Sequence, residues 1–260
     1  MIDNIAFATV LFLCCVYFAA GFIDSVAGGG GLISIPLFLL VNVPADFVLG
    51  TNKMVTPFGT ASALALYAKN GFVLWRMALL GLPAALLGGF LGSKTILLFD
   101  NTAIGHIVIF LLPLGIAATF ISKNKTAEIK QLTKYSLYVY CPLICFCIGF
   151  YDGFFGPGTG SFFILAFHSL LGIGLIYASA TAKLFNFASG VSSAIAFALQ
   201  GKVLYFVAIP LAVSNIAGNV IGSKLAIKTG ASFIRKILIV SLTILFISLI
   251  WKFFIGTPRS

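Results

Sequence analysis

Charged side chains are scarce in this chain of 260 residues. Asp, Glu, Lys and Arg together make up 8% of it, and the acidic residues number only six. An ordinary soluble domain contains about 25% charged residues, whereas here hydrophobic residues account for 60% of the chain. This composition excludes an ordinary soluble globular domain.

The apolar segments lack the strict alternation of apolar and polar residues that marks the strands of a membrane β-barrel. Phe, Gly and Ala are scattered through them instead, and several segments reach the roughly 20 residues that a membrane-spanning helix needs. The sequence therefore predicts an all-α, polytopic integral membrane protein that consists almost entirely of its membrane domain. The apolar segments are residues 5–22, 32–43, 54–68, 77–99, 103–121, 135–150, 161–180, 184–199, 203–221 and 237–256.

The chain also lacks the spacings that mark metal sites, nucleotide-binding loops and nucleophile elbows. We therefore expect no metal, no cofactor and no enzymatic activity. The amino terminus lacks the basic region and the small-residue cleavage site of a signal peptide, so we expect it to form the first helix. The cysteines lie inside apolar segments without metal-ligand spacing, and we interpret them as small packing residues. They are Cys14, Cys15, Cys141, Cys145 and Cys147.

What the chain does have is an excess of positive charge, with a formal net charge of +10. A basic balance of this size can indicate nucleic-acid binding. The Lys and Arg residues, however, mostly cluster in the short segments between apolar runs, as the positive-inside rule describes for membrane proteins. We therefore predict a multi-pass protein whose partner is the lipid bilayer, and no nucleic-acid partner.

The sequence also contains an internal repeat. A shift of 130 residues aligns 51–94 with 181–224 without a gap. Because apolar membrane helices resemble one another trivially, the matching glycines and polar residues carry this alignment. We predict two homologous membrane repeats, residues 1–122 and 135–260, joined by a basic polar linker at 123–134. The matches include Thr51, Lys53, Ser62, Gly71, Gly88, Gly92, Ser93 and Lys94 with Thr181, Lys183, Ser192, Gly201, Gly218, Gly222, Ser223 and Lys224.

The orientation of the two repeats depends on how often each half crosses the membrane. If 5–22 and 32–43 form an out-and-back pair around a glycine-rich break, each half adds three further spans and the repeats are inverted. If only one member of that pair crosses, the repeats are parallel. The inverted arrangement puts 11 Lys and Arg residues on one side and 5 on the other, whereas the parallel arrangement gives 9 and 7. The positive-inside rule therefore favours inverted repeats with both termini outside.

Each half contains an aspartate followed by a glycine-rich break inside an apolar segment. Asp24 precedes the four glycines 28–31, and Asp152 precedes the sequence 156-GPGTG-160. A helix that restarts after such a break presents N–H groups without intrahelical partners and a positive dipole end, and glycine lets an anion come close. We predict that the two breaks line one anion site, with helices restarting near Leu32 and Ser161. The alternative is that the glycines serve a tight turn or close helix packing.

Two aspartates and two lysines are the charged candidates near these breaks. Asp24 and Asp152 can exchange a proton, pair with a lysine or cap the N–H groups of the break, and we take them as candidates for proton coupling. Lys53 and Lys183 occupy equivalent positions, where each can bind an anionic substrate, neutralise an aspartate or snorkel to the headgroups. The candidate substrate-binding residues are Gly28, Gly29, Gly30, Gly31, Thr51, Asn52, Lys53, Gly156, Gly158, Thr159, Gly160, Ser161, Thr181, Lys183 and Asn186.

Several of these motifs together resemble a known family. The motifs are Ile23-Asp24 with 27-AGGGGLISIP-36, 51-TNK-53, 149-GFYDGFFGPGTGSF-162, and 179-SATAK-183 with Asn186. Through them the chain resembles the sulfite exporter TauE/SafE family, also called the toluene sulfonate uptake permease family, over nearly its whole length. The resemblance implies a permease of the cell inner (plasma) membrane for small, often sulfur-containing anions such as sulfite or organosulfonates. It also implies that the aspartates, the glycines and the two lysines are motif positions.

We therefore expect a secondary transporter that moves a small anion by alternating access, with Asp24 or Asp152 as the site of proton coupling. A passive anion channel with the same lining is the alternative. A membrane-embedded enzyme is disfavoured because the chain lacks a paired acid–base or metal constellation.

Overall fold

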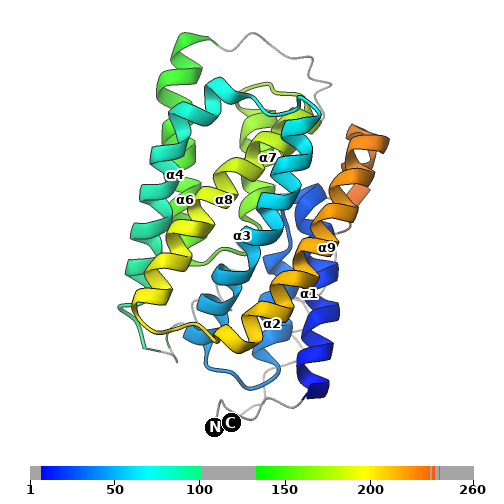
Figure 1. Cartoon of the computed structure of the whole chain (residues 1–260). Coiled ribbons are helices and arrows are strands. Elements are labelled where there is room, and N and C mark those ends of the chain that lie inside the picture. Colours follow the sequence, from blue (N-terminus) through cyan, green and yellow to red (C-terminus); the bar gives the residue numbers. More distant parts are fainter. Residues whose placement is uncertain (1–6, 101–102, 104–132, 235, 238–239, 241–260) are drawn as a thin grey trace, which may run out of the picture.

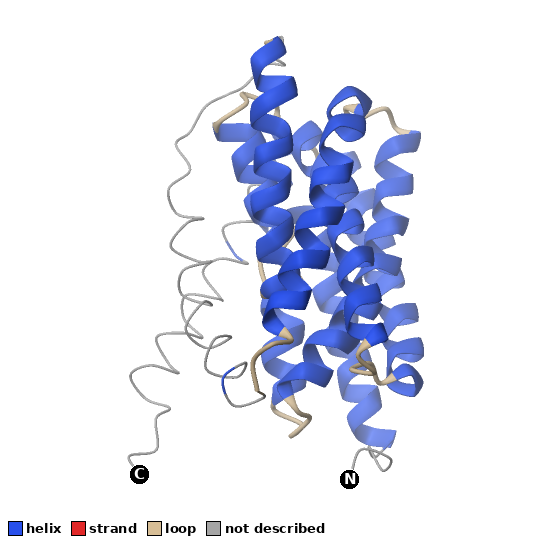
Figure 2. Ribbon diagram, turned by 90° about the vertical axis from the view of Figure 1, so that its left-hand side faces the viewer, coloured by secondary structure: helices blue, strands red, loops and turns tan. Residues whose placement is uncertain are grey.

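The computed structural model describes residues 7–100, 103, 133–234, 236, 237 and 240. Every regular element within these residues is a helix, as the sequence predicted (Figures 1 and 2). Most of the apolar segments 103–121 and 237–256 and most of the linker 123–134 lie outside the described residues. The elements are α1 (Phe7–Ala27), α2 (Gly31–Leu39), α3 (Ala45–Lys69), α4 (Trp75–Ile96), a short π-helical segment η1 (Ser136–Tyr140), α6 (Cys141–Phe154), α7 (Thr159–Ser169), α8 (Leu175–Leu199) and α9 (Tyr205–Thr229).

Five helical segments in the described part are long and apolar enough to cross a membrane. They are α1, α4, η1 continued by α6, α8 and α9, which supports a multi-pass membrane protein. By contrast, α2 has 9 residues and α7 has 11. At a rise of about 1.5 Å per residue, each is roughly half the length that a span requires. Each short helix directly follows a long one and forms a broken pair with it.

The boundaries of the breaks differ slightly from the sequence-based prediction. α1 continues through Asp24 to Ala27, and α6 continues through Asp152 to Phe154. Both aspartates therefore lie inside the last turn of a helix, upstream of the break. The short helices begin at Gly31 and Thr159, one and two residues before the predicted starts.

The order of the helices repeats along the chain. α3 and α8 each have 25 residues, and their bounds differ by the 130 residues of the sequence alignment, as do the starts of α4 and α9. The turns before α4 and α9 are also equivalent, because Gly71 and Gly201 both have a positive φ, of 75° and 67°. The backbone thus repeats where the glycine and polar matches lie.

The most extensive helix packing joins one half to the other. α4 packs against α6 and α9 packs against α1 (Figure 1). Equivalent glycines make these contacts close, because a Cβ atom at any of them would lie 2.1–2.5 Å from a carbonyl oxygen of the facing helix. Small residues allow this approach between membrane helices. These glycines are Gly88 and Gly92 on α4, and Gly218 and Gly222 on α9.

Equivalent helices of the two halves run in opposite directions. In Figure 1, α3 runs upward from blue to cyan, whereas α8 runs downward toward yellow; α4 runs downward and α9 upward. Large apolar side chains on the outer faces of α4 and α9 are exposed, including Leu79, Phe206 and Ile209. Such an exposed apolar surface suits contact with lipid. Trp75 and Tyr205, both 55% exposed, begin these two helices, as aromatic residues do at membrane interfaces.

Candidate functional site

The two glycine-rich breaks touch each other. The N–H of Ser161 donates a hydrogen bond to the carbonyl oxygen of Gly28 (3.2 Å), and the Ser161 hydroxyl donates to the carbonyl oxygen of Ala27 (2.6 Å). A Cβ atom at Gly28 would lie 2.2 Å from the carbonyl carbon of Gly160, and one at Gly160 would lie 2.5 Å from the Cα of Gly28. The backbones of Gly28 and Gly160 are in direct contact, and there is no room for a side chain at either position. The breaks that were predicted to share a site therefore lie together.

Both short helices begin at this contact, which we call the junction: residues 28–31 and 156–161. The N-cap residue of α2 is Gly30. The N-cap residue of α7 is Gly158, whose φ of 83° lies in the left-handed region that glycine tolerates. In neither of these two helices does a side chain cap the first turn. The junction therefore collects the amino-terminal ends of two helices, which carry positive dipole ends.

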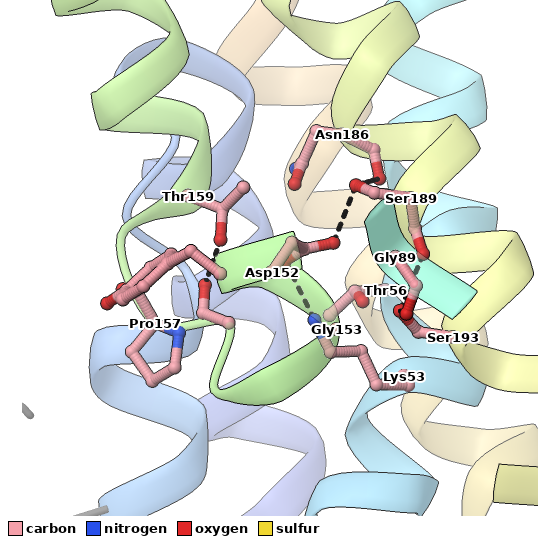
Figure 3. A network of polar contacts seen from close by, with 12 residues as sticks. Lys53, Thr56, Gly89, Asp152, Gly153, Pro157, Thr159, Asn186, Ser189 and Ser193 are labelled. Carbon is pink, nitrogen blue, oxygen red and sulfur yellow. Dashed lines mark hydrogen bonds and ion pairs between the residues drawn. The ribbon is translucent and has the colours of Figure 1, made fainter. Parts of the chain in front are cut away.

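Two buried ion pairs each join one half to the other. The ammonium of Lys53 lies 2.7 Å from the carboxylate of Asp152 (Figure 3), and that of Lys183 lies 3.3 Å from the carboxylate of Asp24. The lysine side chains are 4% and 0% exposed, so neither snorkels to the headgroups. The aspartates pair with lysines instead of capping α2 or α7. In this structure, each lysine therefore neutralises the aspartate of the opposite half.

The central helices α3 and α8 each reach both aspartates. α3 places its lysine on Asp152 and the hydroxyl of Thr60 at 3.4 Å from Asp24. α8 places its lysine on Asp24 and the hydroxyl of Ser189 at 2.7 Å from Asp152, to which it donates (Figure 3). Each carboxylate is therefore held by an ammonium from one half and a hydroxyl from the other.

The two ion pairs have different surroundings. The Lys183 ammonium also donates to the backbone carbonyl of Asp24. Among the described residues, the Lys53 ammonium has the Asp152 carboxylate as its one hydrogen-bond partner. It also lies against the junction, since a Cβ atom at Gly156 would be 2.6 Å from its Nζ. Lys53 is therefore the ammonium group placed beside the start of α7.

The paired threonines of the predicted site hold helix starts. The hydroxyl of Thr51 accepts a hydrogen bond from the N–H of Leu204 (3.0 Å), and the hydroxyl of Thr181 accepts one from the N–H of Leu74 (3.1 Å). Leu204 and Leu74 are the N-cap residues of α9 and α4. Each threonine therefore fixes a helix of the opposite half to α3 or α8, two residues before the site lysine.

Asn52 lies next to Lys53 and is buried. Its side-chain oxygen accepts hydrogen bonds from the hydroxyls of Tyr17 (3.0 Å) and Ser34 (2.9 Å). The amide thus ties α1 and α2 to α3, on either side of the first break. The sequence analysis did not single out Tyr17 or Ser34.

The remaining candidates lie in the breaks themselves and on α8. The hydroxyl of Thr159 donates to the carbonyl oxygen of Gly156 (2.6 Å), and the N–H of Leu32 donates to that of Gly29 (3.1 Å), so both stabilise local turns. The side-chain amide of Asn186 is half-buried and makes no hydrogen bond within the described part of the chain. Figure 3 shows it beside the Asp152 network. Asn186 is therefore a polar group with hydrogen-bonding capacity to spare.

Comparison with known proteins assigns this arrangement to a family. The sequence matches the family described as "Sulfite exporter TauE/SafE" over residues 13–249. The chain belongs to the TauE/SafE family.

Relatives of this TauE/SafE protein carry transporter names. It is 38% identical over 242 residues to "Probable membrane transporter protein ORF9" of Sinorhizobium sp, covering 92% of this chain and 91% of the relative. It is 38% identical over 229 residues to a probable membrane transporter protein of Haemophilus influenzae, covering 88% and 89%. It is 33% identical over 222 residues to the probable membrane transporter protein YfcA of Escherichia coli, covering 85% and 82%. No solved structure matches. These names support a membrane transporter rather than an enzyme.

Sequence reasoning missed the hydroxyl groups of this TauE/SafE protein that hold the aspartates, Thr60 and Ser189. A signal for Ser189 was present, because it follows Asn186 by three residues and so lies beside it on α8. Frequency obscured this signal, since α8 contains four serines. Periodicity counted on polar residues, and not on apolar ones alone, would have found it.

Proposed function

We propose that this TauE/SafE protein is a secondary transporter for a small, sulfur-containing anion such as sulfite or an organosulfonate. The observation that carries the proposal is the meeting of the amino-terminal ends of α2 and α7 beside buried lysines. Helix starts with glycine backbone bind anions through their N–H groups and dipole. Broken helices of this kind form substrate sites in several transporter folds. The family description, which names sulfite, supports the substrate class.

The substrate site in this proposal lies at the start of α7. Lys53 supplies the positive charge. The N–H groups of Gly156 and Thr159 already donate to backbone carbonyl oxygens and Pro157 has none, so Gly158 and Gly160 supply the N–H groups of the break. The unpaired amide of Asn186 supplies a further hydrogen-bond donor on the α8 side (Figure 3). An oxyanion with several acceptor oxygens suits such a convergent set of donors. The same donors suit a sulfite and a sulfonate, because both present three oxygens on one sulfur.

We further propose that the two halves are inverted repeats in the inner membrane and that transport uses alternating access. The opposite directions of α3 and α8 in Figure 1 support the inversion, as does the loop charge. The direct backbone contact between Gly28 and Gly160 leaves no passage between the breaks. An anion that passes between the breaks requires the two halves to separate at this contact, which is compatible with alternating access.

The test is sulfite flux into vesicles reconstituted with the purified protein. A carrier exchanges substrate, so unlabelled sulfite inside the vesicles should accelerate the entry of radiolabelled sulfite. Lys53→Met should lower this exchange at least tenfold, because the anion loses its counter-charge. Lys202→Met is the matched control: Lys202 is partly exposed and pairs with Asp46 away from the junction, so exchange should be retained. Flux without acceleration by internal sulfite would indicate a channel, and equal exchange in Lys53→Met and wild type would remove Lys53 from the site.

A further inference from the structure

The two ion pairs that join the halves differ in the acceptors of their lysines. The Lys183 ammonium has two acceptors on the same residue, the backbone carbonyl oxygen of Asp24 and its carboxylate. That carboxylate receives only long contacts, 3.3 Å from Lys183 and 3.4 Å from Thr60, beyond the usual range for such bonds. Lys183 is thus tied to the backbone of α1. Its contact with α1 therefore does not depend on the Asp24 carboxylate alone.

Lys53 is held differently. Its ammonium depends on the Asp152 carboxylate, at 2.7 Å, and lies against Gly156 in the junction. Both side chains are about 5% exposed or less. A buried ammonium needs a negative partner nearby, because leaving it unpaired costs several kcal/mol. Any anion that binds Lys53 in the junction therefore meets a carboxylate already in place.

Among the described residues, Lys53 is the one charged side chain that contacts the Asp152 carboxylate. In this part of the chain, the Asp152 carboxylate contacts Lys53 of α3 and the hydroxyl of Ser189 of α8. On the helices packed against α6, Lys183 of α8 pairs with Asp24, and Nδ1 of His168 of α7 lies 2.7 Å from the carbonyl oxygen of Ile173. Lys94 of α4 lies over the Phe90 ring instead (5.1 Å). The neighbouring Tyr151 uses its hydroxyl to donate to a backbone carbonyl. Two negative charges on one ammonium in a buried site repel each other, and one of them must be neutralised.

We propose that Asp152 is the coupling carboxylate: it occupies Lys53 when the site is empty, and the substrate anion replaces it there while Asp152 takes up a proton. The inference rests on the proposed function and specifies its coupling. One proton from water is bound to Asp152, one ion pair is exchanged for another, and no bond of the substrate changes. For a monovalent anion the step is electrically neutral, so anion and proton move together. Asp24 plays no part in it.

The hydrogen bonds around Asp152 permit this exchange. A protonated carboxyl is a donor as well as an acceptor and needs an acceptor near at hand. Ser189 can fill that role, because its own hydroxyl is also within reach of the carbonyl oxygens of Phe185 (3.0 Å) and Asn186 (3.4 Å). The Ser189 hydroxyl can donate to one of these carbonyls in place of Asp152. Its oxygen can then accept a hydrogen bond from the protonated Asp152 carboxyl. The released lysine stays beside the start of α7, where the anion binds.

The experiment counts the protons taken up when sulfite binds. Calorimetric titrations in buffers of different ionisation enthalpy give this number for the wild type, Asp152→Asn and Asp24→Asn. Sulfite's own protonation is the same in all three, so differences between them report on the protein. We expect the wild type and Asp24→Asn to take up about one proton more per sulfite than Asp152→Asn, since asparagine cannot be protonated there. Binding to Asp152→Asn should also lose the pH dependence of the wild type.

The outcomes separate the inference from the proposed function. Equal proton uptake in the wild type and Asp152→Asn would overturn the inference and leave sulfite transport intact. A wild type that binds no sulfite would overturn the proposed substrate and the inference with it. The double variant Lys53→Gln/Asp152→Asn, which replaces the pair with neutral side chains of similar size, guards against misfolding of the single variant. It should bind sulfite at least tenfold more weakly than the wild type, and unaltered binding would overturn the inference as well.

Discussion

At the scale of single residues, two glycines make room for buried asparagines on α9. Gly21 of α1 and Gly59 of α3 face Asn215 and Asn219. Asn219 donates to the backbone carbonyl (3.0 Å) and side-chain oxygen (3.1 Å) of Asn215, which in turn donates to the carbonyl oxygen of Tyr17 (3.1 Å). Buried amides commonly link membrane helices in this way. The glycines of α1 and α3 therefore leave the space that these buried asparagines occupy.

Gly59→Ala should destabilise the protein. The new Cβ would lie 1.9 Å from the side-chain oxygen of Asn215 and 2.4 Å from the side-chain nitrogen of Asn219, so the asparagines must shift and lose hydrogen bonds. Overpacking of this kind costs about 1–3 kcal/mol, which denaturant unfolding in micelles would detect. Gly190→Ala on α8 is the control, because its Cβ would approach only the side chain of Pro57, at 3.2 Å. If both variants unfold at the same denaturant concentration, the close packing at Gly59 does not contribute to the free energy of unfolding.

At the scale of helices, the sequence predicted the elements well and their partners less well. The bounds of α3 and α8 correspond along the gap-free repeat, and the matching glycines Gly71 and Gly201 follow the ends of these helices, where glycine favours a helix stop. Nothing local decides whether Lys53 pairs with Asp24 of its own half or with Asp152, which is 99 residues away. The structure pairs it with Asp152, because α6 packs on α4 and α1 packs on α9. Each aspartate-bearing helix thus lies against the opposite half.

A double-mutant cycle would test this exchange of partners. Lys53→Gln or Asp152→Asn alone should each cost about 3–5 kcal/mol of unfolding free energy, because the remaining buried charge is unpaired. The double variant should cost clearly less than the sum. The matching cycle of Lys53→Gln with Asp24→Asn should be additive within about 0.5 kcal/mol, as expected for residues that share no contact. Coupling in the second cycle and additivity in the first would mean that the lysine pairs within its own half.

At the scale of the whole molecule, the ends at the α3–α4 and α8–α9 turns have equivalent backbones and different side chains. At one end, Lys202 pairs with Asp46 (2.7 Å) and lies over the ring of Phe47 (5.1 Å). At the equivalent place on the other end, Phe72 packs edge-to-face on Tyr177 (5.6 Å). The contact at the first end is therefore ionic and the contact at the second end is aromatic, although the 130-residue alignment makes Lys202 equivalent to Phe72. Equivalent backbone positions therefore carry different side chains at the two ends.

These two ends should lie on opposite sides of the membrane. Asn70 and Gln200 are equivalent, exposed C-cap residues of α3 and α8, so a cysteine at each reports on the same point of each half. The experiment uses a variant without the five native cysteines and a membrane-impermeant maleimide. Asn70→Cys and Gln200→Cys should be labelled from opposite faces of the membrane, so one should react in right-side-out vesicles and the other in inverted vesicles. Loop charge puts the Asn70 side in the cytoplasm. Labelling of both cysteines from one face would mean that the repeats are parallel. The two broken helix pairs would then enter the membrane from the same side, and this would contradict the proposed alternating access between inverted halves.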